Sequence, residues 1–378
     1  MRIRLRLLII LALVGSFANK SRAQKKSFWK SVAAFLDSTN VKGVDPAYIT
    51  LPDKPWALVL NSCVDKLSLE VASTMYMKSV VEEEGMSEAM IRLQIKPPVT
   101  TSLGFWAGYR GVGAGYSLSL SDNDGFSFAM NLVSPSYGIN LRINRFSFDK
   151  PIVSMSWNMN GPGGSGEETF DDAFVQDALS SPMQIGTLVL DGYWVFNKKR
   201  FSMLAAYDQT TIQLRSAGSL IAGLMFYYQK LDYDSPKNLF LIQPFSNMGM
   251  MKVYQGGIGL GYTYNWVPAR RWVVNATAMP VLTLLNQVKT SNYELKYPDL
   301  ENYSGSEWIN DLSMEYIGDE RVNGGIRLNF DWRMGVSYLW RDWYLGVAGQ
   351  AHRFRSNSND TTLKLTDWTV KAFVGMRL

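Results

Sequence analysis

The sequence predicts an all-β protein, an antiparallel transmembrane β-barrel of about 12 strands with a short N-terminal helix. Apolar residues alternate with polar or small residues along many segments, as they do in strands with one apolar face. Short links between these segments alternate with long polar ones, which is the turn and loop asymmetry of outer-membrane barrels. No segment after the N-terminus reaches ~18 uninterrupted apolar residues, so membrane-spanning helices are not expected.

Residues 1–23 have the pattern of a secretory signal peptide. Basic residues precede an apolar stretch from Leu7 to Val14, and small residues flank an expected cleavage point before Gln24. The apolar stretch is too short to cross a bilayer as a helix. Removal of residues 1–23 would leave 33 basic and 33 acidic residues, a net charge of zero. We therefore expect export and no nucleic-acid partner.

Residues 24–55 are predicted to form an N-terminal helix and a linker. Phe28, Val32, Phe35 and Leu36 fall on one face of a helix over 28–39. Prolines between positions 46 and 55 then interrupt regular structure. The predicted barrel follows over residues 56–378.

The clearest alternation lies in residues 326–340. Apolar side chains occupy the even positions, whereas Arg327, Asn329, Asp331 and Arg333 occupy odd positions. The same period occurs in soluble β-sandwiches and lipocalin-like barrels, so period alone does not place the protein in a membrane. A long strand with a charged face, and aromatic residues near strand ends, favour a transmembrane barrel with its apolar face outward.

We expect strands near 56–78, 88–109, 111–121, 126–147, 151–159, 184–197, 200–230, 252–267, 271–285, 324–340, 342–355 and 364–378. Within 126–147 the apolar residues shift from even to odd positions near Pro135. We interpret this shift as a bulge inside one strand. Twelve strands would agree with the even number found in bacterial single-chain barrels.

The inward face of these strands predicts a polar lumen. The expected lumen-lining residues are Arg142, Asn144, Arg327, Asn329, Asp331, Arg333, Gln350, His352 and Lys371. Their charges are mostly basic, so a water-filled lumen would favour anions weakly. Glycines at every second position, in 111–115 and 257–261, instead suggest that something bulky packs inside. Either the helix at 28–39 or the stretch 209–215 would then plug the barrel, and we favour this occluded form.

The last strand runs to the end of the chain, as it commonly does in outer-membrane barrels. Lys371, Met376 and Leu378 fit the C-terminal signal that the barrel-assembly machinery recognises. Two positions depart from that signal, because Phe373 stands where glycine is usual and Leu378 replaces the final aromatic residue.

The sequence offers little material for catalysis. His352 is the only histidine and Cys63 the only cysteine, which excludes multi-histidine metal sites and intrachain disulfides. A Gly-x-Ser-x-Gly serine elbow is absent. We expect no catalytic residues, metal or cofactor, and a narrow or plugged channel or a structural barrel. The alternatives are a barrel-embedded lipid-modifying enzyme that uses His352, or a soluble periplasmic ligand-binding barrel.

Several short segments together resemble a known family. They are Lys-Pro-Pro at 96–98, Gly-Phe-Trp-Ala-Gly-Tyr at 104–109, Arg-Phe-Ser-Met-Leu-Ala-Ala-Tyr at 200–207, Ser-Ala-Gly-Ser at 216–219 and Gly-Tyr-Thr-Tyr-Asn-Trp-Val at 261–267. From about residue 45 to the end, the chain resembles the domain-of-unknown-function family numbered 4421. That resemblance implies an exported barrel in the outer membrane of a Gram-negative bacterium, surrounded by outer-membrane lipid. It implies no activity.

The links predict an orientation. Residues 287–323 are too long and polar for a turn, so we expect them outside the cell, with both mature termini in the periplasm. Protease added to intact cells should cut within 287–323 and leave the link at 266–272 intact. Cleavage at 266–272 alone would invert this topology.

Overall fold

The structure is a computed structural model that describes residues 43–77, 87–96, 99–121, 124–148, 152–160, 166–170, 182–207, 209–232, 248–299, 311–358 and 361–378. The predicted signal peptide and the predicted helix over 28–39 lie outside the described residues. The short helix that the structure describes is α4 (Leu204–Tyr207), far from the N-terminus. Residues from Val44 to Leu378 form one compact unit.

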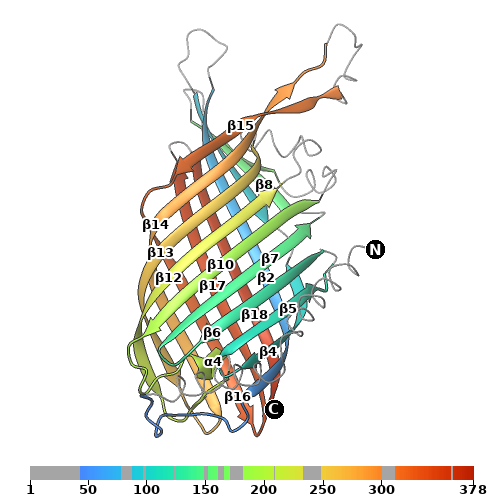
Figure 1. Ribbon diagram of the computed structural model, residues 1–378. Helices are drawn as coiled ribbons and strands as arrows, with labels where there is room; N and C mark the ends of the chain where they lie inside the picture. Colours follow the sequence, from blue (N-terminus) through green and yellow to red (C-terminus); the bar gives the residue numbers. More distant parts are fainter. Residues whose placement is uncertain are drawn as a thin grey trace, which may run out of the picture. The chain divides into compact units, whose positions relative to one another are not determined.

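Twelve antiparallel strands close into a barrel (Figure 1), which confirms the predicted antiparallel barrel of about 12 strands. β18 pairs with β2 from Arg377 opposite Ala57 to Thr361 opposite Ser73, and this pairing closes the ring. In order around the ring the strands are β2 (Trp56–Met77), β4 (Thr100–Tyr109), β5 (Val112–Ser119), β6 (Gly125–Val133), β7 (Tyr137–Phe148), β10 (Met183–Val195), β12 (Ala217–Asp232), β13 (Met248–Trp266), β14 (Trp272–Lys296), β16 (Arg327–Trp340), β17 (Trp343–Ser358) and β18 (Thr361–Arg377).

Two barrel strands continue beyond the wall and carry further strands. The upper half of β2 pairs with β3 (Ser87–Lys96), which pairs with β8 (Ile152–Asn160), and β9 (Gly166–Phe170) follows. The upper half of β14 leaves β16 and pairs with β15 (Ser313–Asn323). The predicted outer loop 287–323 is therefore largely a β-hairpin. Within it Asp319 accepts hydrogen bonds from Lys289 and Ser291, which lower the pKa of the Asp319 carboxyl to about 2.

The predicted strand boundaries contain errors that cancel. Residues 126–147 form two strands, because Pro135 lies in a tight turn in which the Ser134 hydroxyl accepts the backbone N–H groups of Ser136 and Tyr137. The interpretation of a bulge is wrong. The predicted strand 88–109 is likewise divided into β3 and β4, and the predicted strand 151–159 corresponds to β8, which lies outside the ring. The predicted count of twelve is still correct, because 126–147 contributes two strands to the ring instead of one and 151–159 contributes none.

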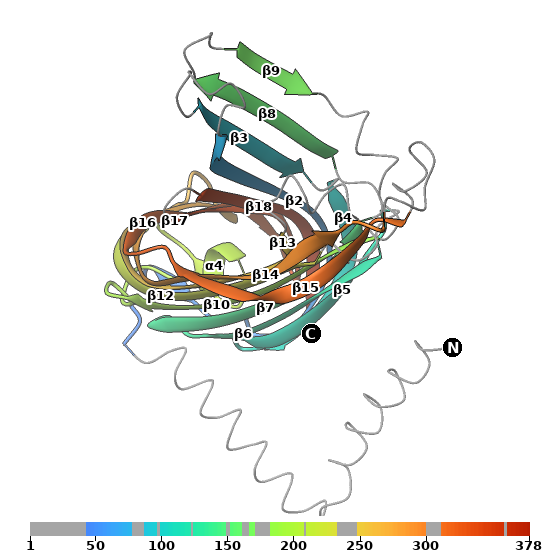
Figure 2. The same ribbon diagram turned by 90° about the horizontal axis from the view of Figure 1, so that it is seen from above.

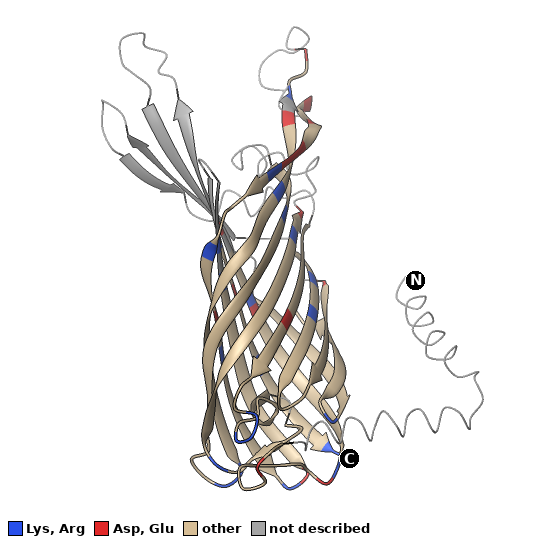
Figure 3. Cartoon of the chain, turned by 60° about the vertical axis from the view of Figure 1, so that its left-hand side comes forward, with Lys and Arg blue, Asp and Glu red and all other residues tan. Residues whose placement is uncertain are grey.

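The wall has an apolar outer face and a buried inner face, as the alternation predicts. On β16, Leu328 is 67% exposed, whereas its neighbour Asn329 is 6% exposed. Exposed tryptophans mark the lower strand ends, at positions 56, 194, 266, 272, 340 and 343. Charged residues are sparse along the middle of the wall (Figure 3). Within the described residues, no helix has the length and apolar character that a membrane span requires.

Both ends of the barrel segment lie at the end with the short turns. The backbone N–H of Trp56 donates to Leu378 O at 3.1 Å, and Leu378 N–H donates back to Trp56 O at 3.0 Å. The turn from β4 to β5 consists of Arg110 and Gly111, both with positive φ, as a two-residue hairpin turn requires. The extensions of β2 and β14 lie at the opposite end (Figure 1).

The outer face generates a prediction for folding into membranes. Leu260 on β13 and Ile317 on β15 are both 61% exposed, but only Leu260 belongs to the barrel wall. Leu260→Arg should destabilise the membrane-inserted barrel by about 2 to 4 kcal/mol, because a charge near the bilayer midplane must leave water. Ile317→Arg should change the free energy of unfolding little. Urea titrations in lipid vesicles measure both, and equal effects would mean that the outer face does not contact hydrocarbon.

Candidate functional site

The lower part of the lumen is filled by the chain between β10 and β12. Residues 200–216 were predicted to belong to a strand, but β12 begins only at Ala217. The preceding residues instead turn inward, and α4 lies inside the ring when the barrel is viewed from above (Figure 2). Phe201 and Leu204 are fully buried there. Residues 196–216, together with residues 44–55 beside them, are called the plug below.

Polar contacts fix the plug to the barrel wall. The Tyr207 hydroxyl donates to Asn275 Oδ1 at 2.6 Å, and Gln209 Nε2 donates to Ser337 Oγ at 2.6 Å. Arg377, near the C-terminus, donates to the backbone carbonyl of Gln209 at 2.7 Å. These partners come from β14, β16 and β18, so three strands of the wall hold the plug.

The N-terminal part of the plug is attached to its central part. β1 (Ile49–Thr50) pairs with β11 (Ile212–Gln213) as a separate two-stranded sheet. The guanidinium groups of Arg200 and Arg215 lie 5.0 Å and 5.8 Å from the centroid of the Tyr48 ring. Cation–π contacts of this kind contribute about 0.5 to 1 kcal/mol each where they are exposed.

The upper part of the lumen is closed by apolar side chains. β10 and β18 lie opposite each other in the twelve-strand ring, yet Ile185 and Val189 of β10 belong to one buried cluster with Leu365 of β18. Tyr227 of β12 is fully buried in the same cluster. The two walls therefore touch through these side chains. The cluster consists of Phe146, Phe148, Met183, Ile185, Val189, Met225, Tyr227, Leu231, Met251, Val253 and Leu365, and is called the upper cluster below.

Ion pairs cross the lumen between the plug and the upper cluster. Arg333 on β16 contacts Asp331 at 2.8 Å and Asp191 of β10 at 3.3 Å. Arg142 on β7 lies 3.7 Å from Asp367 of β18. All five side chains are at least four-fifths buried, so each charge depends on its partners rather than on water.

Arg142 also reaches the wall opposite its own. It donates from Nη2 to the Gln350 amide oxygen of β17 at 3.0 Å when that oxygen faces it. β7 and β17 are six positions apart in the ring of twelve. This contact therefore spans the full width of the lumen.

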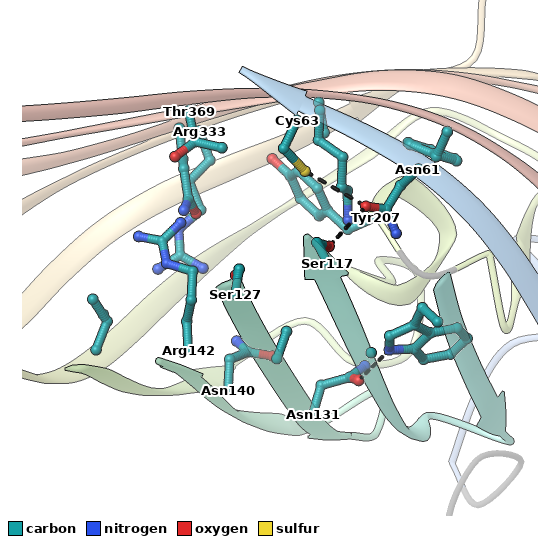
Figure 4. A pocket seen from close by; sticks show the side chains of 18 of the residues that line it. Asn61, Cys63, Ser117, Ser127, Asn131, Asn140, Arg142, Tyr207, Arg333 and Thr369 are labelled. Carbon is teal, nitrogen blue, oxygen red and sulfur yellow. Dashed lines mark hydrogen bonds between the residues drawn. The ribbon is translucent and has the colours of Figure 1, made fainter. Parts of the chain in front are cut away.

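A cavity of about 260 Å³ lies at the level of these ion pairs. Arg142, Asn140 and Asn131 project into it from one wall, and Asn61 and Cys63 from another (Figure 4). Tyr207 of the plug also lines it.

The glycine stripes accommodate side chains of neighbouring strands. A side chain at Gly108 or Gly113 would overlap the Trp106 indole, whose Nε1 donates to Asn131 Oδ1 at 3.1 Å. On the other wall, side chains at Gly223 or Gly259 would meet Met279. The bulky groups that the glycines predicted are therefore these wall side chains, in addition to the plug.

The predicted lumen-lining residues are only partly brought together. Six of them line the cavity, namely Arg142, Asn144, Arg333, Gln350, His352 and Lys371. Asp331 lies directly beside them. Arg327 donates to Gly324 O and Asn329 donates to Thr283 Oγ1, and neither residue lines the cavity.

Two of the three residues in the predicted C-terminal signal share a face. Met376 and Leu378 lie on the outer side of β18, whereas Lys371 lines the cavity. The structure therefore gives Lys371 a place in the lumen that is independent of any role in assembly.

The lining is not mostly basic, contrary to the expectation from sequence. Asp191 and Asp65 line the cavity, and Asp367 and Asp331 contact its arginines. Asp65 shares the odd positions of β2 with Asn61 and Cys63, opposite Leu58, Leu60 and Val64, and this pattern could have revealed one of these acids. Asp191 could not be assigned a partner, because Arg333 is 142 residues away in sequence.

His352 occupies a structural position. Its side chain is 3% exposed, and Nδ1 lies 3.3 Å from Asp331 Oδ1 on the neighbouring strand. It faces the lumen and not the outer side of the wall. Within the described part of the chain, no group of three or more His, Cys, Asp or Glu residues is placed to hold a metal ion.

The buried ion pairs generate a stability prediction. Arg333→Met leaves Asp191 and Asp331 without their shared cation, and breaking a buried pair in this way costs about 3 to 5 kcal/mol. Lys54→Met removes an exposed pair with Asp342 and should cost at most about 1 kcal/mol. Urea unfolding of the refolded protein measures both losses. Similar losses in the two variants would show that the lumen pairs are solvated.

Comparisons with known proteins add the following. No curated protein matches the sequence. Among solved structures, the translocator domain of the autotransporter NalP from Neisseria meningitidis is 8% identical, with a TM-score of 0.29, and 94% of this chain and 98% of that chain are covered. The β domain of the Bordetella autotransporter BrkA is 9% identical, with a TM-score of 0.29, and 86% and 100% are covered. The toluene transporter TodX from Pseudomonas putida is 8% identical, with a TM-score of 0.23, and 86% and 89% are covered.

A family model matches most of the sequence. Residues 63–377 match the family described as "Domain of unknown function (DUF4421)", which is the family that the short segments resemble. The match runs from the middle of β2 to the end of β18 and so includes every strand of the closed ring. The chain belongs to the DUF4421 family.

Proposed function

We propose that this protein is an integral outer-membrane β-barrel of a Gram-negative bacterium that is plugged and has no enzymatic activity. The single observation that carries the proposal is the closure of the lumen at successive levels. The plug fills the lower end, ion pairs cross the middle, and the upper cluster joins opposite walls. A barrel of twelve strands lies between small barrels filled by side chains and large ones with an aqueous channel, so its contents decide whether it conducts.

Two features of the wall support the membrane location. Its outer face is a continuous apolar band, which would be a severe aggregation hazard in water. Its backbone groups are paired around a closed ring, as a hydrocarbon environment requires. A soluble periplasmic barrel, the alternative from sequence, would expose this apolar band to water. Recovery of the protein in the soluble periplasmic fraction would contradict this part of the proposal.

The position of His352 does not favour the enzymatic alternative, a lipid-modifying enzyme that uses this residue. A lipid hydrolase needs its reacting residues within reach of a lipid, but His352 is buried inside the lumen against Asp331. Its partners are those of a histidine that completes a buried ion-pair network. His352→Ala should therefore leave lipid release from outer membranes unchanged.

The closed lumen predicts the electrical behaviour of the protein. The purified mature protein in planar bilayers should give a conductance near zero, because the plug occupies the lower lumen and the upper cluster packs across the upper lumen. Replacing residues 200–216 by Asn-Gly should leave the conductance low, since the upper cluster remains. Adding Tyr227→Ala and Leu365→Ala to that replacement should open a measurable current. A large, unselective current from the unaltered protein would refute the proposal.

A further inference from the structure

Two buried hydrogen-bond donors at the lumen cavity lack an acceptor among the described residues, and a lysine beside them lacks a carboxylate partner there. Arg142 Nε and Asn131 Nδ2 are buried without a hydrogen-bond partner. The orientation of Asn131 is fixed, because its oxygen already accepts from Trp106. Lys371 forms no ion pair with a described carboxylate, and its ammonium lies 5.6 Å from the centroid of the Phe373 ring. All three residues line one cavity.

The carboxylates around the cavity are engaged elsewhere. Asp191 and Asp331 contact Arg333. Asp367 lies against the other end of the Arg142 guanidinium.

Asp65 is the carboxylate nearest to Lys371 in the register of β2 and β18. It accepts a hydrogen bond of 2.5 Å from Thr369 and forms no ion pair with Lys371. A buried donor without an acceptor costs about 1 to 3 kcal/mol, and more when it is charged. The donors and cations of this cavity could therefore be satisfied by acceptor oxygens that carry negative charge.

We propose that the cavity is a binding site for a small oxyanion, a molecule bearing a carboxylate or phosphate group. The anionic group lies between Lys371 and Arg142, where two cations can share its charge. Asn131 Nδ2 donates to a further oxygen of the same ligand. The Trp106 and Phe373 rings, which also line the cavity, face the carbon skeleton.

The volume sets an upper limit on the ligand. About 260 Å³ is the space of on the order of nine water molecules at liquid density. Such a space holds a phosphate ion or an organic acid of a few carbon atoms, but not a lipid or an oligosaccharide. The plug and the upper cluster bound this space, since Met203 and Tyr207 of the plug and Val189 of the upper cluster line it.

Cys63 provides a built-in reporter for the site. It is the only cysteine in the chain, it lines the cavity, and it is the direct cross-strand neighbour of Lys371. A bound anion should shield its thiol from a small uncharged reagent such as methyl methanethiosulfonate. The thermal unfolding midpoint gives a second reading that does not depend on reagent access, since a ligand that binds only the folded protein raises it.

The experiment compares anions at equal ionic strength in the purified full-length mature protein. The probes are sodium phosphate and sodium succinate, with sodium chloride and neutral succinamide as controls. At least one oxyanion should raise the unfolding midpoint in a saturable manner, and should slow Cys63 modification at least threefold if the thiol reacts in the folded protein. An effect of phosphate alone would assign a phosphoryl ligand, and an effect of succinate alone a carboxylate.

Matched variants test the location and the sign of the charge. Lys371→Met should abolish the effect and Lys371→Arg should retain it. Lys296→Met, which removes an exposed lysine of the β14–β15 extension, should leave it unchanged. Asp65→Asn removes a negative charge beside Lys371 and should strengthen anion binding severalfold.

Three outcomes would overturn the proposal. The first is an unfolding midpoint that is the same in phosphate, succinate and chloride. The second is an effect that persists in Lys371→Met, which would place binding elsewhere. The third is weaker binding in Asp65→Asn, which would mean that the site prefers a cationic or zwitterionic ligand.

Discussion

The structure depends on the pairing of β18 with β2. Those strands contribute a ladder of seventeen residue pairs, from Arg377 opposite Ala57 to Thr361 opposite Ser73, and it joins the last strand of the chain to the first strand of the barrel. Without it the sheet would have two open edges, whose unpaired N–H and C=O groups a hydrocarbon environment cannot satisfy. Closure also fixes which face of each strand points inward, because side chains alternate along every strand. The apolar outer band and the polar lumen are both consequences of this register.

A closed ring of twelve strands creates a space that wall side chains alone do not fill evenly. Different parts of the chain fill this space at different levels along the barrel axis. At the lower end it turns inward after β10, and Tyr207 and Gln209 are hydrogen-bonded to the neighbouring strands β14 and β16. At the upper end large side chains meet across the lumen, as Ile185 and Leu365 do. Glycines beside Trp106 and Met279 let these large groups lie flat against the wall.

The middle of the lumen contains buried charged side chains, which must be neutralised by partners. Arg333 is surrounded by two carboxylates, and His352 lies against one of them, so this side of the lumen is locally neutralised. On the other side, among the described residues, Arg142 has one carboxylate partner, at 3.7 Å, and Lys371 forms no ion pair. The two sides therefore differ: the charges around Arg333 form a paired network, whereas the cavity beside Arg142 and Lys371 has hydrogen-bond donors without acceptors in the described part of the chain. The first accounts for stability, and the second underlies the proposed anion site.

The fold class, the two faces of each strand and the end with the short turns could be predicted from the sequence alone, because they follow from local patterns. Alternation over 326–340 predicts that Leu328 points outward and Asp331 inward whatever the rest of the chain does. Local patterns were less reliable where tertiary pairing decides. The strand β8 has a strand-like sequence but pairs with β3 outside the ring, and Pro135 proved to lie in a turn.

Only the tertiary structure decided the contents of the lumen. The alternation shows that Arg142 and Arg333 face inward, but not that Arg142 meets Asp367 and Gln350 while Arg333 meets Asp191. These contacts join strands that lie four to six positions apart in the ring, and no spacing within one strand encodes them. The physical reason is that a closed barrel brings opposite walls together only when every strand is in register, so cross-lumen contacts exist only in the complete ring.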